Sequence, residues 1–130
     1  MPSASAVERG RALFNAGRYF DAHEVWEEVW LSETGERRRL LQGLIQIAAA
    51  LHKAAGGGPA SGCVRLLDAG LDKLDGQTGA PWRLALGRFR GDLRKLRTLA
   101  EAWRQERSGP PEAPFPKLRR SVPRPAREPG

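Results

Sequence analysis

The feature that most restricts the fold is an uninterrupted helical stretch near the middle of the chain, LLQGLIQIAAALHKAA at residues 40–55. Apolar side chains recur at helical spacing along one face: Leu40, Leu44, Ile47 and Leu51. The adjoining face is also largely apolar, and only a narrow polar strip interrupts it: Gln42, Gln46 and Lys53. A helix that is apolar around most of its circumference is expected at the centre of a helical bundle.

Glycine, proline and polar turns divide the rest of the folded part into further helices. The hydrophobic spacing predicts helices over about 5–16, 21–31, 36–55, 60–74 and 87–106. Gly17 is expected to end the first helix, and Asp21 to cap the second, with Glu24 completing a capping box. Neither a strand pattern nor an internal repeat competes. The predicted fold class is therefore all-α, a single-domain bundle of about five helices.

The C-terminal segment has a different composition. From Ser108 onward, seven of the 23 residues are proline, and several of the others are arginine. We therefore expect a helical bundle domain over residues 1–107 and a proline- and arginine-rich tail, extended or disordered, over residues 108–130. Within that tail, Phe115 and Leu118 are the apolar residues able to anchor it to the bundle.

Length and composition narrow the class of protein further. A chain of 130 residues is long enough for one domain with a core. It has no apolar run long enough to span a membrane, and its N-terminal residues lack the apolar stretch of a secretory signal. The single cysteine, Cys63, excludes an intramolecular disulfide and a cysteine-based zinc cluster, and we interpret it as a packing residue. We expect a cytoplasmic protein without membrane contact.

Charge is distributed unevenly along the chain. The net charge is +7, yet residues 21–36 carry six acidic side chains and no lysine or arginine. Residues 88–107 carry seven basic side chains against three acidic ones. Nucleic-acid binding through the last helix and the tail is therefore one hypothesis. We disfavour it, because an arginine-rich composition alone gives such a charge and the sequence has no recognisable DNA-reading motif.

The stretch FDAHEVWEEVW, residues 20–30, places one of the two histidines among glutamates and tryptophans. Its apolar members form a buried stripe: Ala22, Val25, Trp26, Val29 and Trp30. His23 and Glu27 lie one helical turn apart at the border of that stripe, whereas Glu28 faces away from it. Such a pair is either a hydrogen-bonded histidine at the edge of the core or half of a metal or acid–base site. The residues alone leave both interpretations open.

The other histidine, His52, lies on an apolar face of the central helix, where an imidazole without a partner would be costly. It needs solvent or a polar partner, which His23, Glu27 or a bound ligand would supply. The candidate site therefore combines His23, Glu27 and His52 as ligands of a divalent metal, with His23 and Glu27 also as candidate catalytic groups. Gln42 and Gln46 are candidate ligand-binding amides. The stronger HExxH zinc signature is absent.

Three segments in order carry a resemblance to a known family: GRYFDAHEVWEEVW at 17–30, LLQGLIQIAAALHKAAGG at 40–57 and GCVRLLDAGLDKL at 62–74. Together they resemble the small bacterial and archaeal family called domain of unknown function 309, over about residues 10–75. The residues that match its pattern are Tyr19, Phe20, His23, Glu24, Glu27, Trp30, Gln42, Gly43, Gln46 and His52. The resemblance implies an all-helical fold and no particular reaction, and it strengthens the case for a polar site.

Three functions remain compatible with the sequence, which does not decide whether the protein is an enzyme. The first is a metal or small-ligand site between the second and third helices, with metal-assisted hydrolysis as its simplest chemistry. The second is a helical module that binds a protein partner or forms a homodimer, because AGRYFDAHEVWEEVW also has the rhythm of a helical-repeat hairpin. The third is the disfavoured nucleic-acid binder.

Overall fold

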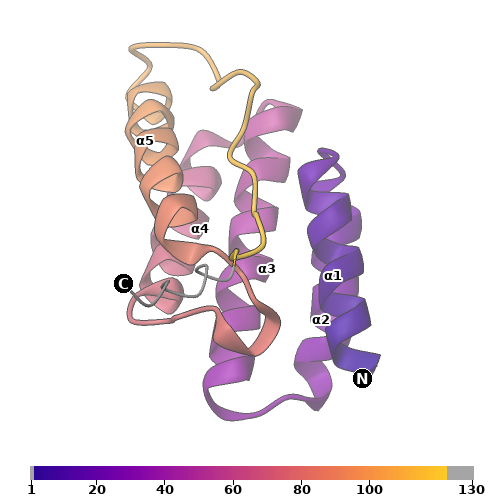
Figure 1. Cartoon of the computed structure of the whole chain (residues 1–130). Helices are drawn as coiled ribbons and strands as arrows, with labels where there is room; N and C mark the ends of the chain where they lie inside the picture. The colour runs from indigo at the N-terminus through magenta and orange to yellow at the C-terminus, as the bar shows by residue number, and fades with distance from the viewer. Residues whose placement is uncertain (1, 123–130) are drawn as a thin grey trace, which may run out of the picture.

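The computed structural model describes residues 2–122. These residues form five α-helices and one short 3-10 turn: α1 (Pro2–Asn15), α2 (Tyr19–Ser32), α3 (Gly35–Gly56), α4 (Ala60–Leu74), η1 (Ala80–Trp82) and α5 (Leu86–Arg104). Each α-helix packs against the next in the chain, so α3 lies in the middle of the arrangement (Figure 1). The predicted all-α fold is confirmed. None of the described helices is long and apolar enough to cross a membrane, and a cytoplasmic location stays a prediction.

The central position of α3 follows from its nearly continuous apolar surface. Its predicted face is fully buried, at Leu40, Leu44, Ile47 and Leu51. Burial of one such side chain contributes about 1.5–3 kcal/mol, so this face is a major source of stability. The helix ends at Gly57, whose φ of 87° lies in the left-handed region that glycine adopts without strain.

Helices α3 and α4 approach each other closely at two glycines. A Cβ atom added to Gly70 would lie 2.5 Å from Cδ1 of Ile47 and 3.0 Å from the carbonyl oxygen of Gly43. A Cβ atom added to Gly43 would meet Lys73 and Leu74 of α4 at 3.0 Å. Gly43 on α3 and Gly70 on α4 therefore allow the two helices to pack closely.

Trp26 joins α1 to α2. Its indole ring is fully buried, and its Nε1–H donates a hydrogen bond to the carbonyl oxygen of Val7, at 3.1 Å. Gly10 provides the space for the ring, since a Cβ atom there would lie 2.3 Å from the indole nitrogen. The ring also packs near Phe14, with centroids 5.8 Å apart. The two N-terminal helices are thus held by one large side chain and one matching gap.

The predicted capping box on the second helix is wrong. Helix α2 begins at Tyr19, two residues before Asp21, and no side chain caps its N-terminus. Asp21 lies in the first turn, where it forms an ion pair with Arg18 at 2.6 Å. The cause is the burial of Tyr19, whose ring packs edge-on against Phe14, so the helix starts immediately after the turn. Gly17 ends α1 in the left-handed conformation, with φ of 81°, as predicted.

After α5 the chain returns across the bundle without helix. Figure 1 shows this segment passing downward in front of α3, between α5 and α1. We call residues 115–121 the return strap. Leu118 is fully buried; its N–H donates to Oδ1 of Asn15 (2.8 Å), and its carbonyl accepts from Nδ2 of Asn15 (2.9 Å). Phe115 packs edge-on against Tyr19.

The strap is also held on its other side. The backbone N–H of Ala85 donates to the carbonyl of Arg119, and that of Ser121 donates to the carbonyl of Arg83. The structure therefore places both predicted anchors, Phe115 and Leu118, against the bundle. The domain boundary at residue 107 stays a prediction, and residues 123–130 of the expected tail lie outside the described residues.

An ion pair across the strap gives it a pH dependence that can be measured. Glu8 of α1 accepts from Arg11 at 2.6 Å and pairs with Arg120 of the strap at 3.1 Å. These guanidinium groups, Arg11 above all, lower the pKa of Glu8 from 4.5 to about 2. A carboxylate with a lowered folded pKa stabilises the folded state above its unfolded pKa. That stabilisation should therefore be lost as the pH falls from about 4.5 to about 2.

We expect the backbone amide of Ser121, which donates to the carbonyl of Arg83, to exchange hydrogen faster across this pH interval, after correction for intrinsic exchange rates. Because Glu8 is about one third exposed, the effect should be below about 1 kcal/mol. Amide exchange measured by NMR checks this. The Glu8→Gln variant is the control, since it should show fast exchange already at neutral pH and little further change on acidification. Equal protection of the strap in both proteins at neutral pH would contradict the prediction.

Candidate functional site

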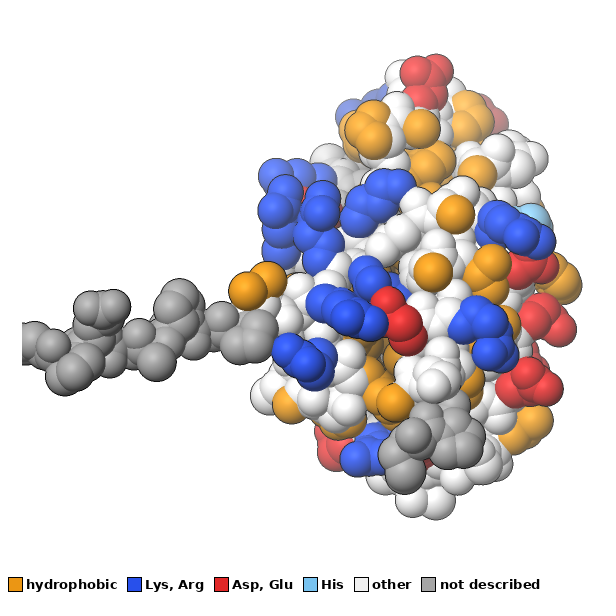
Figure 2. All heavy atoms as spheres, turned by 45° about the vertical axis from the view of Figure 1, so that its right-hand side comes forward, with side chains coloured by type: hydrophobic (Ala, Val, Ile, Leu, Met, Phe, Trp, Pro, Cys, Tyr) orange, Lys and Arg blue, Asp and Glu red, His pale blue; other side chains and the backbone are white. Residues whose placement is uncertain are grey.

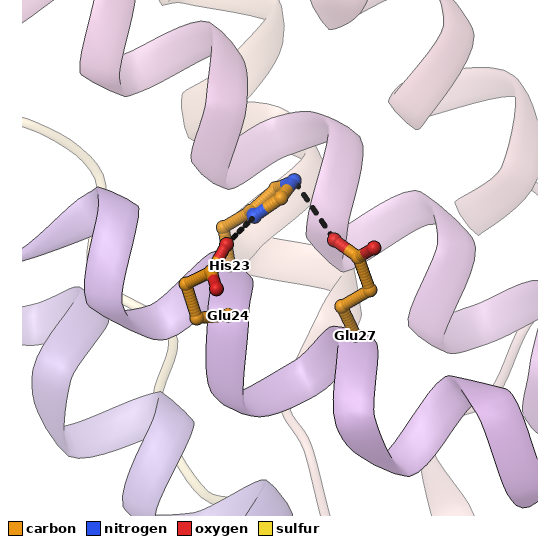
Figure 3. Close-up of side chains that lie close together, drawn as sticks. All are labelled: His23, Glu24 and Glu27. Atoms are coloured by element: carbon orange, nitrogen blue, oxygen red, sulfur yellow. Dashed lines mark ion pairs between the residues drawn. The ribbon is translucent and has the colours of Figure 1, made fainter.

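The candidate site lies on the outer face of α2, where the ring of His23 stands between two carboxylates (Figure 3). Nε2 of His23 is 3.5 Å from Oε2 of Glu27, and Nδ1 is 3.4 Å from Oε1 of Glu24. The helix itself creates this geometry, because Glu27 is one turn further on and Glu24 is the next residue in the chain. The side chain of His23 is 26% exposed, and both carboxylates reach solvent.

Two buried side-chain polar atoms, one of them in this site and one on α3, have no hydrogen-bond partner among the described residues. They are Nδ1 of His23 and Oε1 of Gln46, and both atoms are buried. The 3.4 Å contact between Glu24 and Nδ1 is close enough for an ion pair but is not aligned as a hydrogen bond. A buried polar atom without a partner costs about 1–3 kcal/mol, so each is a place where a small change of geometry or a bound species would be favourable.

The three side chains His23, Glu24 and Glu27 can offer one ligand atom each within 4.8 Å of one another. Within the described chain they are the group of three or more metal-ligating side chains that meets this distance. The structure therefore brings together two of the predicted ligands, His23 and Glu27, and adds Glu24. Sequence reasoning missed Glu24 because it assigned that residue to the helix cap. Its position directly after His23 in the sequence could have identified it as part of the site.

His52 does not belong to that group. It is exposed on α3, so solvent supplies the polar surroundings that the sequence analysis required for it. The exposed ring of Phe20 lies between the two histidines. It stacks nearly parallel to His23, with ring centroids 6.1 Å apart, and is tilted against His52 at 5.8 Å. A ligand role for His52 stays a prediction.

Gln42 and Gln46 lie half-buried on the polar strip of α3. Gln42 lines a shallow hollow with Trp30 and Lys73, beside Arg38, whose guanidinium group stacks on the Trp30 ring at 3.9 Å. Neither amide forms a hydrogen bond with His23 or Glu27 among the described contacts. Ligand binding by these two glutamines therefore also stays a prediction.

The surroundings of the site are open rather than enclosed. A hollow between α5 and the segment 112–119 lies elsewhere on the described surface. The donor atoms on α2 can thus exchange a ligand with solvent, but they are not at the base of a deep substrate pocket. Cys63 takes no part in the site, because it is buried and burial raises its pKa to about 11, which keeps the thiol protonated.

These features define an all-helical domain with a histidine–glutamate site on one exposed helix face. Residues 7–66 match the sequence model of the family described as Domain of unknown function (DUF309). Over these residues the match confirms the resemblance to the family to which the sequence motifs pointed. The matched segment contains every candidate site residue and ends before α5 and the return strap.

A second comparison gives a relative without an assigned activity. An uncharacterised protein of Aquifex aeolicus (strain VF5) is 37% identical to this chain over 70 residues. The similar segment covers 53% of this chain and 21% of that protein, so the chain spans about a fifth of the length of its relative. No solved structure matches the chain significantly. The comparisons therefore show similarity to one family over part of the chain and leave the function to be argued from the site.

Proposed function

We propose that this protein binds a divalent transition-metal cation at the edge formed by His23 and Glu27. The observation that carries the proposal is the 3.5 Å separation of Nε2 and Oε2. Two ligands of a tetrahedral zinc ion, each about 2.0–2.2 Å from the metal, are themselves about 3.4 Å apart. The two atoms therefore already stand near the separation that a shared cation requires. Imidazole and carboxylate are both suitable ligands for such cations.

Glu24 has a positioning role in this proposal. Its carboxylate lies at Nδ1 of His23, the nitrogen that is buried and has no aligned partner. A carboxylate at that nitrogen favours a proton on Nδ1 and leaves the lone pair of Nε2 directed toward Glu27. Histidines that bind metals commonly donate their second N–H to a carboxylate in this way.

The chemistry of the loaded site follows from its few protein ligands. His23 and Glu27 leave the remaining coordination positions to water or to an anionic ligand. A cation bound in this way is weakly held and exchangeable, and hydrolysis through metal-bound water is the reaction open to it. The exposed position of the site favours cation binding as the primary function, with hydrolysis as a secondary property of the loaded protein.

The test is a titration of protein prepared without a histidine tag and first treated with a chelator. We expect saturable binding of zinc at one site, measured by calorimetry, and a rise in melting temperature with metal concentration. His23→Gln and Glu27→Gln should each weaken binding by about tenfold or more, and Glu24→Gln by about tenfold.

Two matched variants serve as controls. Glu28→Gln removes the same charge from the same helix one residue beyond Glu27, and His52→Gln removes the other imidazole. Both should bind zinc as the unaltered protein does. Absence of saturable binding, or unchanged binding in His23→Gln, would overturn the proposal. Loss of binding in His52→Gln would instead support the ligand set predicted from the sequence, His23 with His52.

A further inference from the structure

We propose that a second copy of this chain is the partner for the groove between α5 and the return strap, and that it docks there through the exposed face of its α2. The inference does not depend on cation binding. It starts from the groove, a hollow lined by residues of α5 and of the segment 112–119. The floor of the groove is apolar, formed by Leu96, Leu99, Phe115 and neighbouring prolines. Leu99 is 54% exposed, so the groove presents apolar surface to solvent.

The rim of the groove carries basic side chains that form few ion pairs or hydrogen bonds within the protein. Three basic side chains line it: Lys95, Lys117 and Arg119. Among the described residues, neither Lys95 nor the Arg119 side chain forms an ion pair or a hydrogen bond, and Lys117 donates only to a backbone carbonyl. The acidic members of the lining are Asp92, which lies 3.9 Å from Arg88, and Glu112. The groove thus offers an apolar floor and a mainly cationic rim.

The exposed face of α2 has the complementary character. Its residues recur at helical spacing: Phe20, Glu24, Glu27, Glu28 and Leu31. Phe20 is 56% exposed and Leu31 is 68% exposed, so the stripe has an apolar residue at each end and carboxylates between them. The two apolar ends are about 16 Å apart, at 1.5 Å of rise per residue. No lysine or arginine lies between residues 19 and 36 to neutralise these carboxylates along the chain.

The exposed apolar residues of the described chain divide in the same way as the charges. The four large ones are Phe20, Leu31, Leu99 and Val122. The first two lie among the carboxylates of α2, and the other two lie beside the lysines and arginines of α5 and the strap. Figure 2 shows acidic and apolar side chains together along part of one edge of the molecule, and several basic side chains gathered elsewhere on that face. The α2 face and the groove are therefore complementary in charge, and each is partly apolar.

A nucleic acid fits the groove less well than a protein does. The floor is apolar, and two carboxylates, Asp92 and Glu112, would face a phosphate backbone. Two of the nearby arginines are also already engaged, since Arg11 and Arg120 both pair with Glu8. An acidic helix with apolar ends meets the groove better, because it supplies both kinds of contact at once.

The docking surfaces differ, so the contact is heterologous. Helix α2 packs between α1 and α3, whereas the groove is formed by α5 and the strap. Each copy therefore offers one α2 face and one groove. The α2 face of one copy binds the groove of the next, so association produces either a closed ring or an open chain. Charge pairing at the rim makes the association sensitive to salt.

The test measures molar mass by sedimentation or by light scattering, on full-length protein treated with a chelator. We expect concentration-dependent association at about 0.05 M salt and its loss at about 0.5 M salt, where the Debye length is only a few ångströms. Two double variants break one surface each: Glu28→Lys with Leu31→Ser, and Lys95→Glu with Arg119→Glu. Each alone should be a monomer. Both leave His23, Glu24 and Glu27 unchanged, so a failure here is separable from a failure of the cation site.

Mixing the two double variants gives the decisive result. One retains an intact groove and the other an intact α2 face, so the mixture should form a one-to-one complex that grows no further. Arg94→Glu with Glu33→Lys is the control, since it changes the same kinds of charge away from the groove and the stripe and should associate as the unaltered protein does. A monomer under all salt conditions, or no complex in the mixture, would overturn the proposal. Salt-sensitive binding of duplex or single-stranded RNA by a protein that stays monomeric would assign the groove to nucleic acid instead.

Discussion

Trp26→Ala is expected to lower the free energy of unfolding by about 3–5 kcal/mol, the range for removing a buried tryptophan. The ring is fully buried between α1 and α2, and its N–H satisfies the carbonyl of Val7. Removal of the ring leaves a cavity beside Phe14 and leaves the carbonyl oxygen of Val7 without its hydrogen bond. The higher helix propensity of alanine offsets less than about 1 kcal/mol of this loss. Because domains of this size have a total stability of about 5–15 kcal/mol, the variant should be close to unfolding.

Urea denaturation followed by far-UV circular dichroism measures this difference. Trp30→Ala is the matched control, since Trp30 lies on the same helix and is only partly buried, with Arg38 stacked on its ring. It should lose no more than about 1–2 kcal/mol. Trp26→Phe keeps an aromatic ring and removes the N–H, so it should fall between the two. Equal losses for Trp26→Ala and Trp30→Ala would show that the α1–α2 contact does not depend on this indole.

The sequence predicted the helices well because their signals are local. Hydrophobic spacing and the glycine–proline boundaries gave α4 its observed ends, Ala60 and Leu74, and gave α3 its central place. The pairing of His23 with Glu27 was predicted for the same reason, since two residues one turn apart on a helix meet whatever surrounds them. A contact set within five consecutive residues can be predicted from the sequence.

The capping box is the prediction that failed, and it failed because of a contact outside the helix end. Asp21 is a good capping residue by type, but Tyr19 is buried against Phe14, so α2 begins two residues before Asp21. A helical wheel likewise gives the direction of His52 but not its exposure, which the structure shows to be high. The position where the return strap docks is even harder to predict from the sequence, because Asn15 and Leu118, which hold it, are 103 residues apart. No periodic pattern encodes such a pairing.

The docking of the strap leads to the second large effect. Leu118→Ala is expected to cost about 2–5 kcal/mol at a fully buried site. The measured loss has an upper limit, however, because the strap follows the last helix and can detach while the five helices stay folded. We therefore expect the helical circular dichroism signal to be retained, while the amides of Leu118 and Ser121 lose protection against hydrogen exchange. Val122→Ala, at a highly exposed neighbour, should leave that protection unchanged.

A detached strap would also remove one wall of the groove, although Leu118 is not part of its lining. Leu118→Ala should therefore weaken self-association at low salt as strongly as Lys95→Glu with Arg119→Glu, and should leave zinc binding at His23 unchanged. Retained association with an unprotected strap would mean that α5 alone forms the docking surface. Lost zinc binding would mean that the variant disturbs the whole bundle, because His23 lies on α2, the strap follows α5, and the two share no described contact.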